Sequence, residues 1–205
     1  MTRDAALRRL LAQIAAGDDP AAQAVLAETP ALAAAALQEG ATRAAPAAHF
    51  LAEIGHYLYA GDTALHVAAA AHRPALVRVL LDLGAARGAR NRRGATPLHL
   101  AADGRPGVPG WDPAAQAETI ALLIAAGADP DAADKNGVAP LHRAVRTRSA
   151  AAVRALLAGG ADPRLRNGNG STARDLATRA TGRSGSGSPE ARAEQAEILG
   201  LLDAA

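Results

Sequence analysis

The chain has 205 residues, of which 49% are hydrophobic and only 2% aromatic. β-Sandwich and β-barrel cores are normally built from β-branched and aromatic side chains, so this composition argues against both and favours an all-α fold. The formal net charge is only +2, and the absence of cysteine excludes disulfides, thiolate metal sites and cysteine nucleophiles. No apolar run approaches the length of a membrane span or a secretory signal, so we expect a soluble, cytoplasmic protein with no membrane partner.

The first part of the chain, residues 1–60, predicts a helix, a turn and a second helix, with the break at Gly17–Pro20. Residues 41–60 contain three of the four aromatic residues, and we expect either a further helix or an extended loop there. This region carries four arginines against six acidic residues. We interpret it as a degenerate N-terminal helical cap that covers the apolar face of the units that follow.

Four similar segments follow this cap. Their sequences are GDTALHVAAA from Gly61, GATPLHLAAD from Gly94, GVAPLHRAVR from Gly137 and GSTARDLATR from Gly170. The starts lie 33, 43 and 33 residues apart. A fixed period of this length predicts a repeat array. The predicted units are 61–93, 94–136 with an insertion at 103–113, 137–169, and 170–205 with an insertion at 181–189, all in one continuous domain.

Each unit predicts two helices and a protruding loop. Thr63 and Thr96 stand where a helix N-cap hydroxyl is needed, and Pro97 and Pro140 fit the first helical position. The second helix carries an apolar stripe with the spacing V-x-x-L-L. The stripe residues are Val77, Leu80 and Leu81; Ile120, Leu123 and Ile124; Val153, Leu156 and Leu157; and Ile198, Leu201 and Leu202. Gly84, Gly127 and Gly160 then predict left-handed helix ends, and the turn-forming residues after them predict hairpin-like loops.

The pattern T-P-L-H-x-A at a period of 33 residues resembles the ankyrin repeat, most closely in TPLHLAA at 96–102 and GADPDAADKNG at 127–137. The resemblance implies an ankyrin-repeat solenoid of stacked helix-turn-helix units with hairpin-like loops. It also implies a non-enzymatic protein-interaction or scaffolding module. The last unit has TARD in place of TPLH, which is typical of a terminal capping repeat with a polar outer face.

The histidines His66, His99 and His142 occupy the same position in successive units. Equivalent positions on stacked helices lie roughly 8–10 Å apart, whereas zinc needs all its nitrogen ligands at about 2.0–2.1 Å. One metal therefore cannot bind all three, and we expect no metal site. The resemblance implies a structural role instead, in which each histidine bonds the N-cap threonine and the loop backbone.

Catalytic and phosphate-binding motifs are weak in this sequence. No serine lies in a nucleophile elbow, and with no cysteine we expect no enzyme and no cofactor. The Gly/Ser loop at 182–188 precedes a predicted helix, as phosphate-binding loops do, but it lacks the P-loop lysine and a surrounding βαβ unit. The alternative function is therefore a phosphate- or nucleotide-binding, or enzyme-associated, regulatory protein that uses this loop.

The resemblance also implies where a partner binds: at loop tips before each repeat glycine and at the exposed end of each first helix. The corresponding residues are Arg90, Arg92, Arg93, Lys135, Asn136 and Arg166 in the loops, and Arg146 and Arg179 at the helix ends. Because guanidinium groups pair with carboxylates in a bidentate manner, we expect a protein partner with an acidic surface. The alternative is a solvated surface in an arginine-rich chain.

Other partners are less favoured by the sequence. The loops lack the interleaved aromatic residues that stack on bases, which argues against nucleic acid as a partner. We also expect the protein to be a monomer. The insertion at 103–113 carries the only tryptophan, Trp111. Tryptophan is enriched in interface hot spots, so Trp111 predicts a secondary contact with a partner. The alternative, which we favour, is that it folds back to cover its own repeat.

Overall fold

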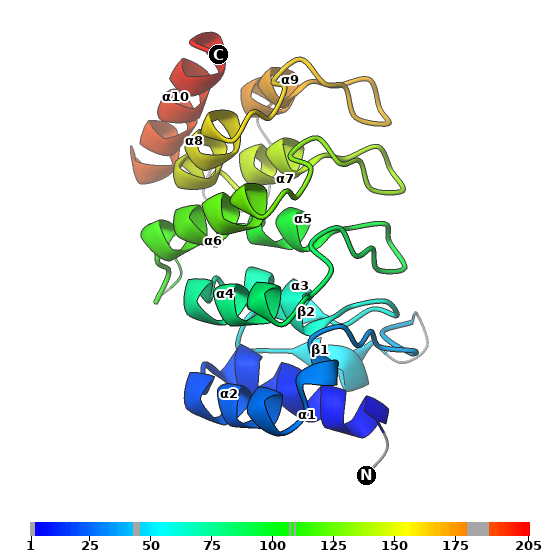
Figure 1. Ribbon diagram of the computed structural model, residues 1–205. Helices are drawn as coiled ribbons and strands as arrows, with labels where there is room; N and C mark the ends of the chain where they lie inside the picture. The colour runs from blue at the N-terminus through cyan, green and yellow to red at the C-terminus, as the bar shows by residue number, and fades with distance from the viewer. Residues whose placement is uncertain (1–2, 43–45, 107, 109, 180–188) are drawn as a thin grey trace.

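The helices of the chain stack in antiparallel pairs, with loops projecting to one side and the two termini at opposite ends of the stack (Figure 1). The computed structural model describes residues 3–42, 46–106, 108, 110–179 and 189–205. The α-helices in these residues are α1 (Arg3–Ala16), α2 (Asp19–Glu28), α3 (Ala64–Ala70), α4 (Pro74–Asp82), α5 (Pro97–Ala101), α6 (Pro113–Ala125), α7 (Pro140–Arg146), α8 (Ala150–Ala158), α9 (Ala173–Thr178) and α10 (Pro189–Asp203). The predicted all-α solenoid is confirmed.

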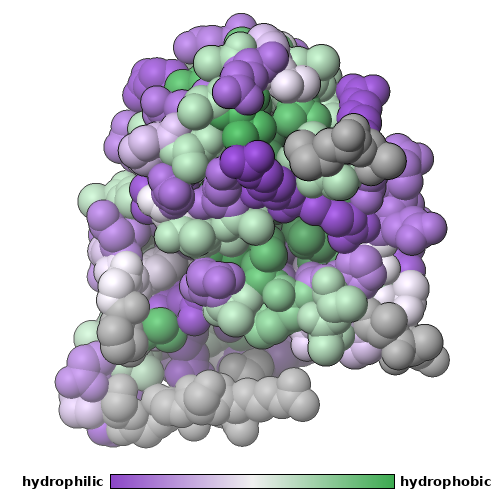
Figure 2. All heavy atoms as spheres, turned by 90° about the horizontal axis from the view of Figure 1, so that it is seen from below, coloured by the Kyte–Doolittle hydropathy of each residue, from purple (hydrophilic) through white to green (hydrophobic). Residues whose placement is uncertain are grey.

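The N-terminal pair α1 and α2 packs under the first repeat. The predicted break between them is confirmed: Gly17 has a φ of 76°, and the Asp18 side chain caps α2 by accepting from the Ala21 N–H. The apolar residues of α1 face inward, and Leu10, Leu11 and Ile14 are completely buried. The outer face, seen end-on in Figure 2, has hydrophilic side chains running between its apolar areas. Such an interrupted face is what a terminal repeat exposed to water requires.

A short hairpin connects this pair to the first repeat. It follows the 3₁₀ turns Pro30–Leu32 and Ala47–His49, and it pairs β1 (Phe50–Leu51) with β2 (His56–Tyr57) in antiparallel register. The expectation of an extended loop is therefore correct and that of a further helix is wrong. The aromatic residues favour strands, and Gly55, with a φ of 61°, allows the tight turn.

The first helix of each repeat begins as the sequence predicts. Thr63 and Thr96 are the N-caps of α3 and α5, and Pro97 and Pro140 occupy the first turn of α5 and α7. In the last unit, Thr172 caps α9, and its backbone N–H donates to the Asp175 carboxylate. Asp175 thus replaces the histidine of the other units in the same capping arrangement.

The core is built from both helices of each repeat and from α1, and the second helices contribute the predicted stripe. The first two positions of the V-x-x-L-L stripe are buried in α4, α6 and α8, whereas the third is only partly buried. In α10 the buried pair is Ile198 and Leu202 instead of Ile198 and Leu201. This helix packs on α8 and α9. Gly84, Gly127 and Gly160 have φ values of 81°, 87° and 90°, which confirms the left-handed helix ends.

The first insertion lies between α5 and α6. Its Gly104 N–H donates to the Thr147 hydroxyl of the next repeat at 3.0 Å, which fixes its start against the stack. The second predicted insertion, 181–189, lies outside the described residues except for Pro189, the first residue of α10. No helix in the part of the chain that the structure describes is long and apolar enough to cross a membrane.

Candidate binding surface

Each protruding loop is built on one side chain that accepts two backbone hydrogen bonds. Asn91 Oδ1 accepts from the N–H groups two and four residues ahead, at 2.9 and 3.1 Å. Asp134 does the same at 2.8 and 3.1 Å, and Asn167 at 2.9 and 3.1 Å. Our sequence reasoning did not find these residues. The signal was an Asn or Asp three residues before the repeat glycine in each unit, an arrangement that favours Asx turns.

The loops also hydrogen-bond to one another through their backbones. The Arg92 N–H donates to the Ala60 carbonyl, the Lys135 N–H to Arg93, and the Gly168 N–H to Asn136. A Cβ on Gly168 would lie 2.4 Å from the Asn136 oxygen, so only glycine allows this approach. The loop tips consequently form one continuous edge, visible on the right of Figure 1.

A groove of about 240 Å³ lies between these loops and the inner helices α5 and α7. Its walls include Tyr57 and Tyr59 from the hairpin segment, and Arg143 and Arg146 from α7. Of the residues predicted to bind a partner, the groove brings together Arg93, Asn136 and Arg146. Our sequence reasoning missed the tyrosines and Arg143, because the register aligns repeats but does not show what the preceding hairpin contributes.

Two of the predicted arginines donate hydrogen bonds across their own loops. Arg90 donates to the Gly94 carbonyl at 2.8 Å and to the Ala133 carbonyl of the next loop at 2.7 Å. Arg166 donates to the Gly170 carbonyl at 2.7 Å. In both cases the acceptor lies four residues ahead, on the far side of the loop. These guanidinium groups therefore brace their loops, which reduces the number of donors left for a partner.

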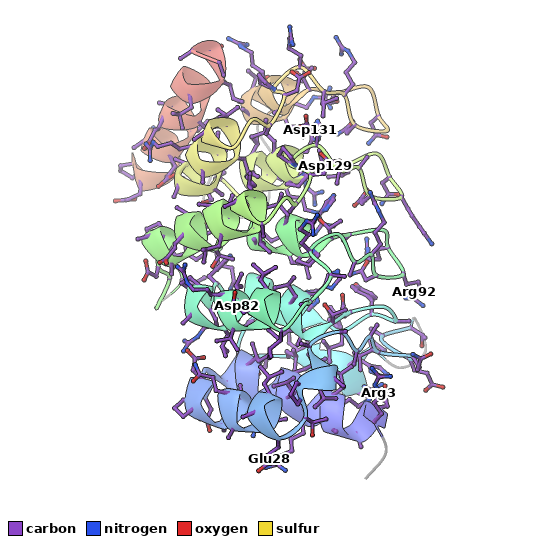
Figure 3. The ribbon with its side chains drawn as sticks, viewed as in Figure 1. Arg3, Glu28, Asp82, Arg92, Asp129 and Asp131 are labelled. Carbon is purple, nitrogen blue, oxygen red and sulfur yellow. The ribbon has the colours of Figure 1, made fainter. Side chains whose placement is uncertain are left out.

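Arg92 and Arg93 surround the ring of Tyr59. Their guanidinium carbons lie 5.6 and 5.3 Å from its ring centroid, within the range of cation–π attraction. Arg92 also donates to the Ala41 carbonyl at 2.7 Å, and Arg93 to the Tyr59 hydroxyl at 3.1 Å. Figure 3 shows Arg92 at the outer end of its loop. Both arginines remain exposed although they are held in position.

The remaining predicted residues are more open. Lys135, Asn136, Arg146 and Arg179 are all exposed. Within the described residues, the side chains of Lys135 and Arg146 form no ion pair. The pKa of Asp175 is lowered mainly by hydrogen bonds from Thr172, and to a smaller extent by the charges of Arg166 and Arg179. Arg146 ends α7 beside the groove, and Arg179 ends α9 further along the stack.

Arg143 is the most buried arginine of the groove. Only 13% of its side chain is exposed, and it binds Asp103 at 2.8 Å and Asp134 at 3.3 Å. Burial raises the pKa of Asp134, but the N–H groups of Asn136 and Val138 together with Arg143 outweigh it and lower the pKa below 3.8. The two carboxylates that face the groove are thus both paired with one arginine of the protein itself.

Arg143→Met is expected to lower the free energy of unfolding by about 1.5–3 kcal/mol, because it leaves Asp134 without a charged donor. Urea denaturation at pH 7 measures this change. The matched control is Arg154→Met, which removes an exposed ion pair with Glu197 and should cost about 0–1 kcal/mol. Equal losses in the two variants would show that the pairing of Arg143 contributes nothing beyond a surface contact.

Comparison with known proteins agrees with this architecture. A family model described as "Ankyrin repeats (many copies)" matches residues 51–101 and 123–177, and a second, "Ankyrin repeat", matches residues 93–135.

The chain belongs to the ankyrin repeat family.

A mouse (Mus musculus) protein named NF-kappa-B inhibitor delta is 39% identical over 98 residues, which are 46% of this chain. The matched part spans only 27% of that relative. The likeness therefore covers less than half of this chain and leaves most of the relative's length without a counterpart.

The ankyrin histidines connect each helix start to the next loop. His66 Nδ1 accepts from the Thr63 N–H at 3.2 Å, and its Nε2–H donates to the Ala95 carbonyl at 3.1 Å. His99 does the same with Thr96 at 3.1 Å and Val138 at 2.9 Å, and His142 with Ala139 and Leu165 at 3.1 Å each. The structural role implied by the resemblance is confirmed, except that Ala139 supplies only its backbone. In the described residues no three His, Cys, Asp or Glu side chains cluster as metal ligands.

Trp111 packs against the preceding repeat as well as its own. Its ring lies 5.2 Å from that of His72 in an edge-on arrangement, and one ring edge approaches Gly104. A pocket of about 360 Å³ adjoins it, lined also by Arg73 and Arg105. The tryptophan is partly buried, so a secondary contact with a partner stays a prediction. The Gly/Ser loop 182–188 lies outside the described residues, and its alternative role also stays a prediction.

Proposed function

We propose that the chain is a non-enzymatic protein-interaction module that binds a partner with an acidic surface through the face formed by its loop tips and inner helices. The observation that carries this proposal is the imbalance of charge at the groove. Its two carboxylates, Asp103 and Asp134, are already paired with Arg143. Arg146 and Lys135 are left without an ion pair among the described residues, so the unbalanced charge of the face is positive.

Two further observations support it. The family is one of protein-interaction modules, and the mouse relative is named as an inhibitor of another factor. The loop tips are held by backbone hydrogen bonds from one repeat to the next, so little conformational entropy is lost when a partner binds them. Positively charged side chains on a preorganised edge attract acidic partners, which speeds association. They also fix the position in which the partner is aligned along the edge.

The test compares Lys135→Ala/Arg146→Ala/Arg179→Ala with the wild type in affinity capture from nuclease-treated lysate of the native host. We expect a retained protein whose binding weakens with added salt and falls at least tenfold in the triple variant. The matched control, Arg9→Ala/Arg78→Ala/Arg154→Ala, removes three exposed arginines from other surfaces and should bind as the wild type does. Capture that is identical in both variants, or that finds no protein, would contradict the proposal.

A further inference from the structure

The hairpin before the first repeat concentrates the aromatic residues of a chain that has very few. Phe50 and Tyr57 form a cross-strand pair with ring centroids 4.6 Å apart, and Tyr59 follows two residues later. Phe50 is 42% exposed and Tyr57 is 40% exposed, which makes them the largest apolar side chains on the described surface. Tyrosine and arginine are the residues most enriched in interface hot spots, and here they stand side by side.

The hairpin is fixed in place from below by a buried carboxylate. Asp62 is completely buried and accepts from the Tyr59 N–H at 2.7 Å and from the Asn91 amide at 2.9 Å, with His56 Nε2 at 3.4 Å. The Leu58 N–H donates to the His49 carbonyl at 2.8 Å. The backbone that carries the rings is thus fixed by hydrogen bonds. The rings themselves are not part of the buried core. A function in binding accounts for their exposure.

The charged groups beside the rings define what would bind there. Tyr57 and Tyr59 line the same groove as Arg93 and Arg146. Arg93 is already tied to Tyr59 through its hydroxyl and ring, whereas Arg146 at the other side of the groove is open. The two aspartates of the groove are occupied by Arg143. An apolar group is favoured at the hairpin end and a carboxylate at the Arg146 end.

We propose that the aromatic hairpin is the anchor point of the partner, and that the groove binds a peptide segment in which an apolar or aromatic side chain packs on Phe50 and Tyr57 while neighbouring carboxylates pair with Arg146. This inference rests on the proposed function and adds the apolar anchor to it. The anchor contributes affinity by burial, since covering an exposed aromatic ring removes apolar area from water. The carboxylates fix the direction in which the segment runs along the stack.

The experiment selects 12-residue peptides from a random display library on the full chain and then measures the enriched peptides by fluorescence polarisation. The variants are Phe50→Ser/Tyr57→Ser and, as a matched control, Leu83→Ser, which removes an apolar side chain of 39% exposure at the end of α4. We expect enriched peptides with an apolar or aromatic residue beside Asp or Glu. Their affinity should fall at least tenfold in the double variant and stay unchanged in Leu83→Ser.

A charge-reversal variant distinguishes lost binding from lost folding. Arg146→Glu should weaken the selected peptides and bind more tightly the same peptides with Lys in place of the acidic residues, which an unfolded protein cannot do. Acidic peptides that need Arg146 but bind equally well to Phe50→Ser/Tyr57→Ser would overturn the inference and leave the proposed function intact. Selection of no peptide, or of peptides indifferent to both positions, would overturn both.

Discussion

Replacing Leu80 by alanine should lower the free energy of unfolding by about 2–5 kcal/mol, the usual cost of a leucine-sized cavity in a packed core. Leu80 is completely buried in α4, which packs against α3, α6 and α2. In a repeat protein each unit is stabilised by its neighbours, so a cavity at this position weakens the interfaces on both sides. Leu156→Ala in α8 should have an effect of the same size, because that side chain is equally buried.

Urea denaturation followed by circular dichroism measures this loss. Leu83→Ala is the matched control: it makes the same chemical change three residues further along, at a side chain that is 39% exposed, and should cost less than about 1 kcal/mol. Full retention of stability by Leu80→Ala and Leu156→Ala would mean that the second helices are not packed in the register described here.

Acidification should destabilise the fold well above the pH at which carboxylates titrate. Burial lowers the pKa of His72 and of His99 to about 4, and it also lowers the pKa of His66 and His142. The geometry agrees, because Nδ1 of the three repeat histidines accepts from a backbone N–H and has no room for a proton.

The sign follows from proton uptake. Below pH 6.5 these histidines are protonated in the unfolded chain but stay neutral in the folded protein. The free energy of unfolding therefore falls as the pH drops from 6.5 to about 4. Each such histidine contributes a slope of about 1.4 kcal/mol per pH unit within that window. The carboxyls with lowered pKa, such as Asp62 and Asp134, lose their contribution to the free energy of unfolding only below pH 3.8. They therefore do not affect the slope measured above that pH.

Denaturation curves at pH 7.5, 6, 5 and 4.5 test this expectation, and His72→Asn sharpens it. Asparagine tolerates the left-handed conformation of His72, which has a φ of 51°, but does not titrate. The free energy of unfolding of the variant should therefore depend less steeply on pH than that of the wild type, by about 1.4 kcal/mol per pH unit. This difference in slope is independent of the variant's stability at pH 7.5. A free energy of unfolding that stays constant from pH 7.5 to 4.5 would contradict the assignment of neutral, buried histidines.

The fold was predictable from the sequence because its determinants are local and recur with the period of the repeat. A threonine or a proline at the start of the first helix acts within a few residues of itself, and so do the histidine three residues after the cap and the glycine after the stripe, which three of the four units carry. The hairpin at 50–57 was not predictable in the same way. It occurs once, so no second copy could confirm its pattern, and short apolar runs fit a helix or a strand equally well.

The binding surface was predictable only in outline. The register indicated which residues lie at loop tips and at helix ends, and Lys135 and Arg146 are exposed at these positions. It could not show that Arg90 and Arg166 donate to a carbonyl of their own loop, since that depends on the turn formed by Asn91 and Asn167. Nor could it show that Arg143 pairs with two aspartates of the preceding unit. Each of these outcomes depends on where a long flexible side chain finds its nearest acceptor in three dimensions.

The position of the first insertion has a consequence for how such a chain can change in length. The extra residues lie between α5 and α6, where Arg105 donates to the Glu53 carbonyl of the hairpin segment, and α6 still packs on α4 and α8. The backbone hydrogen bonds that join one loop tip to the next, donated by Arg92, Lys135 and Gly168, include no residue of that turn. The length of the chain between α5 and α6 can therefore change while these hydrogen bonds between loops are kept. An insertion of one residue in a loop would instead displace every hydrogen bond that joins it to the next.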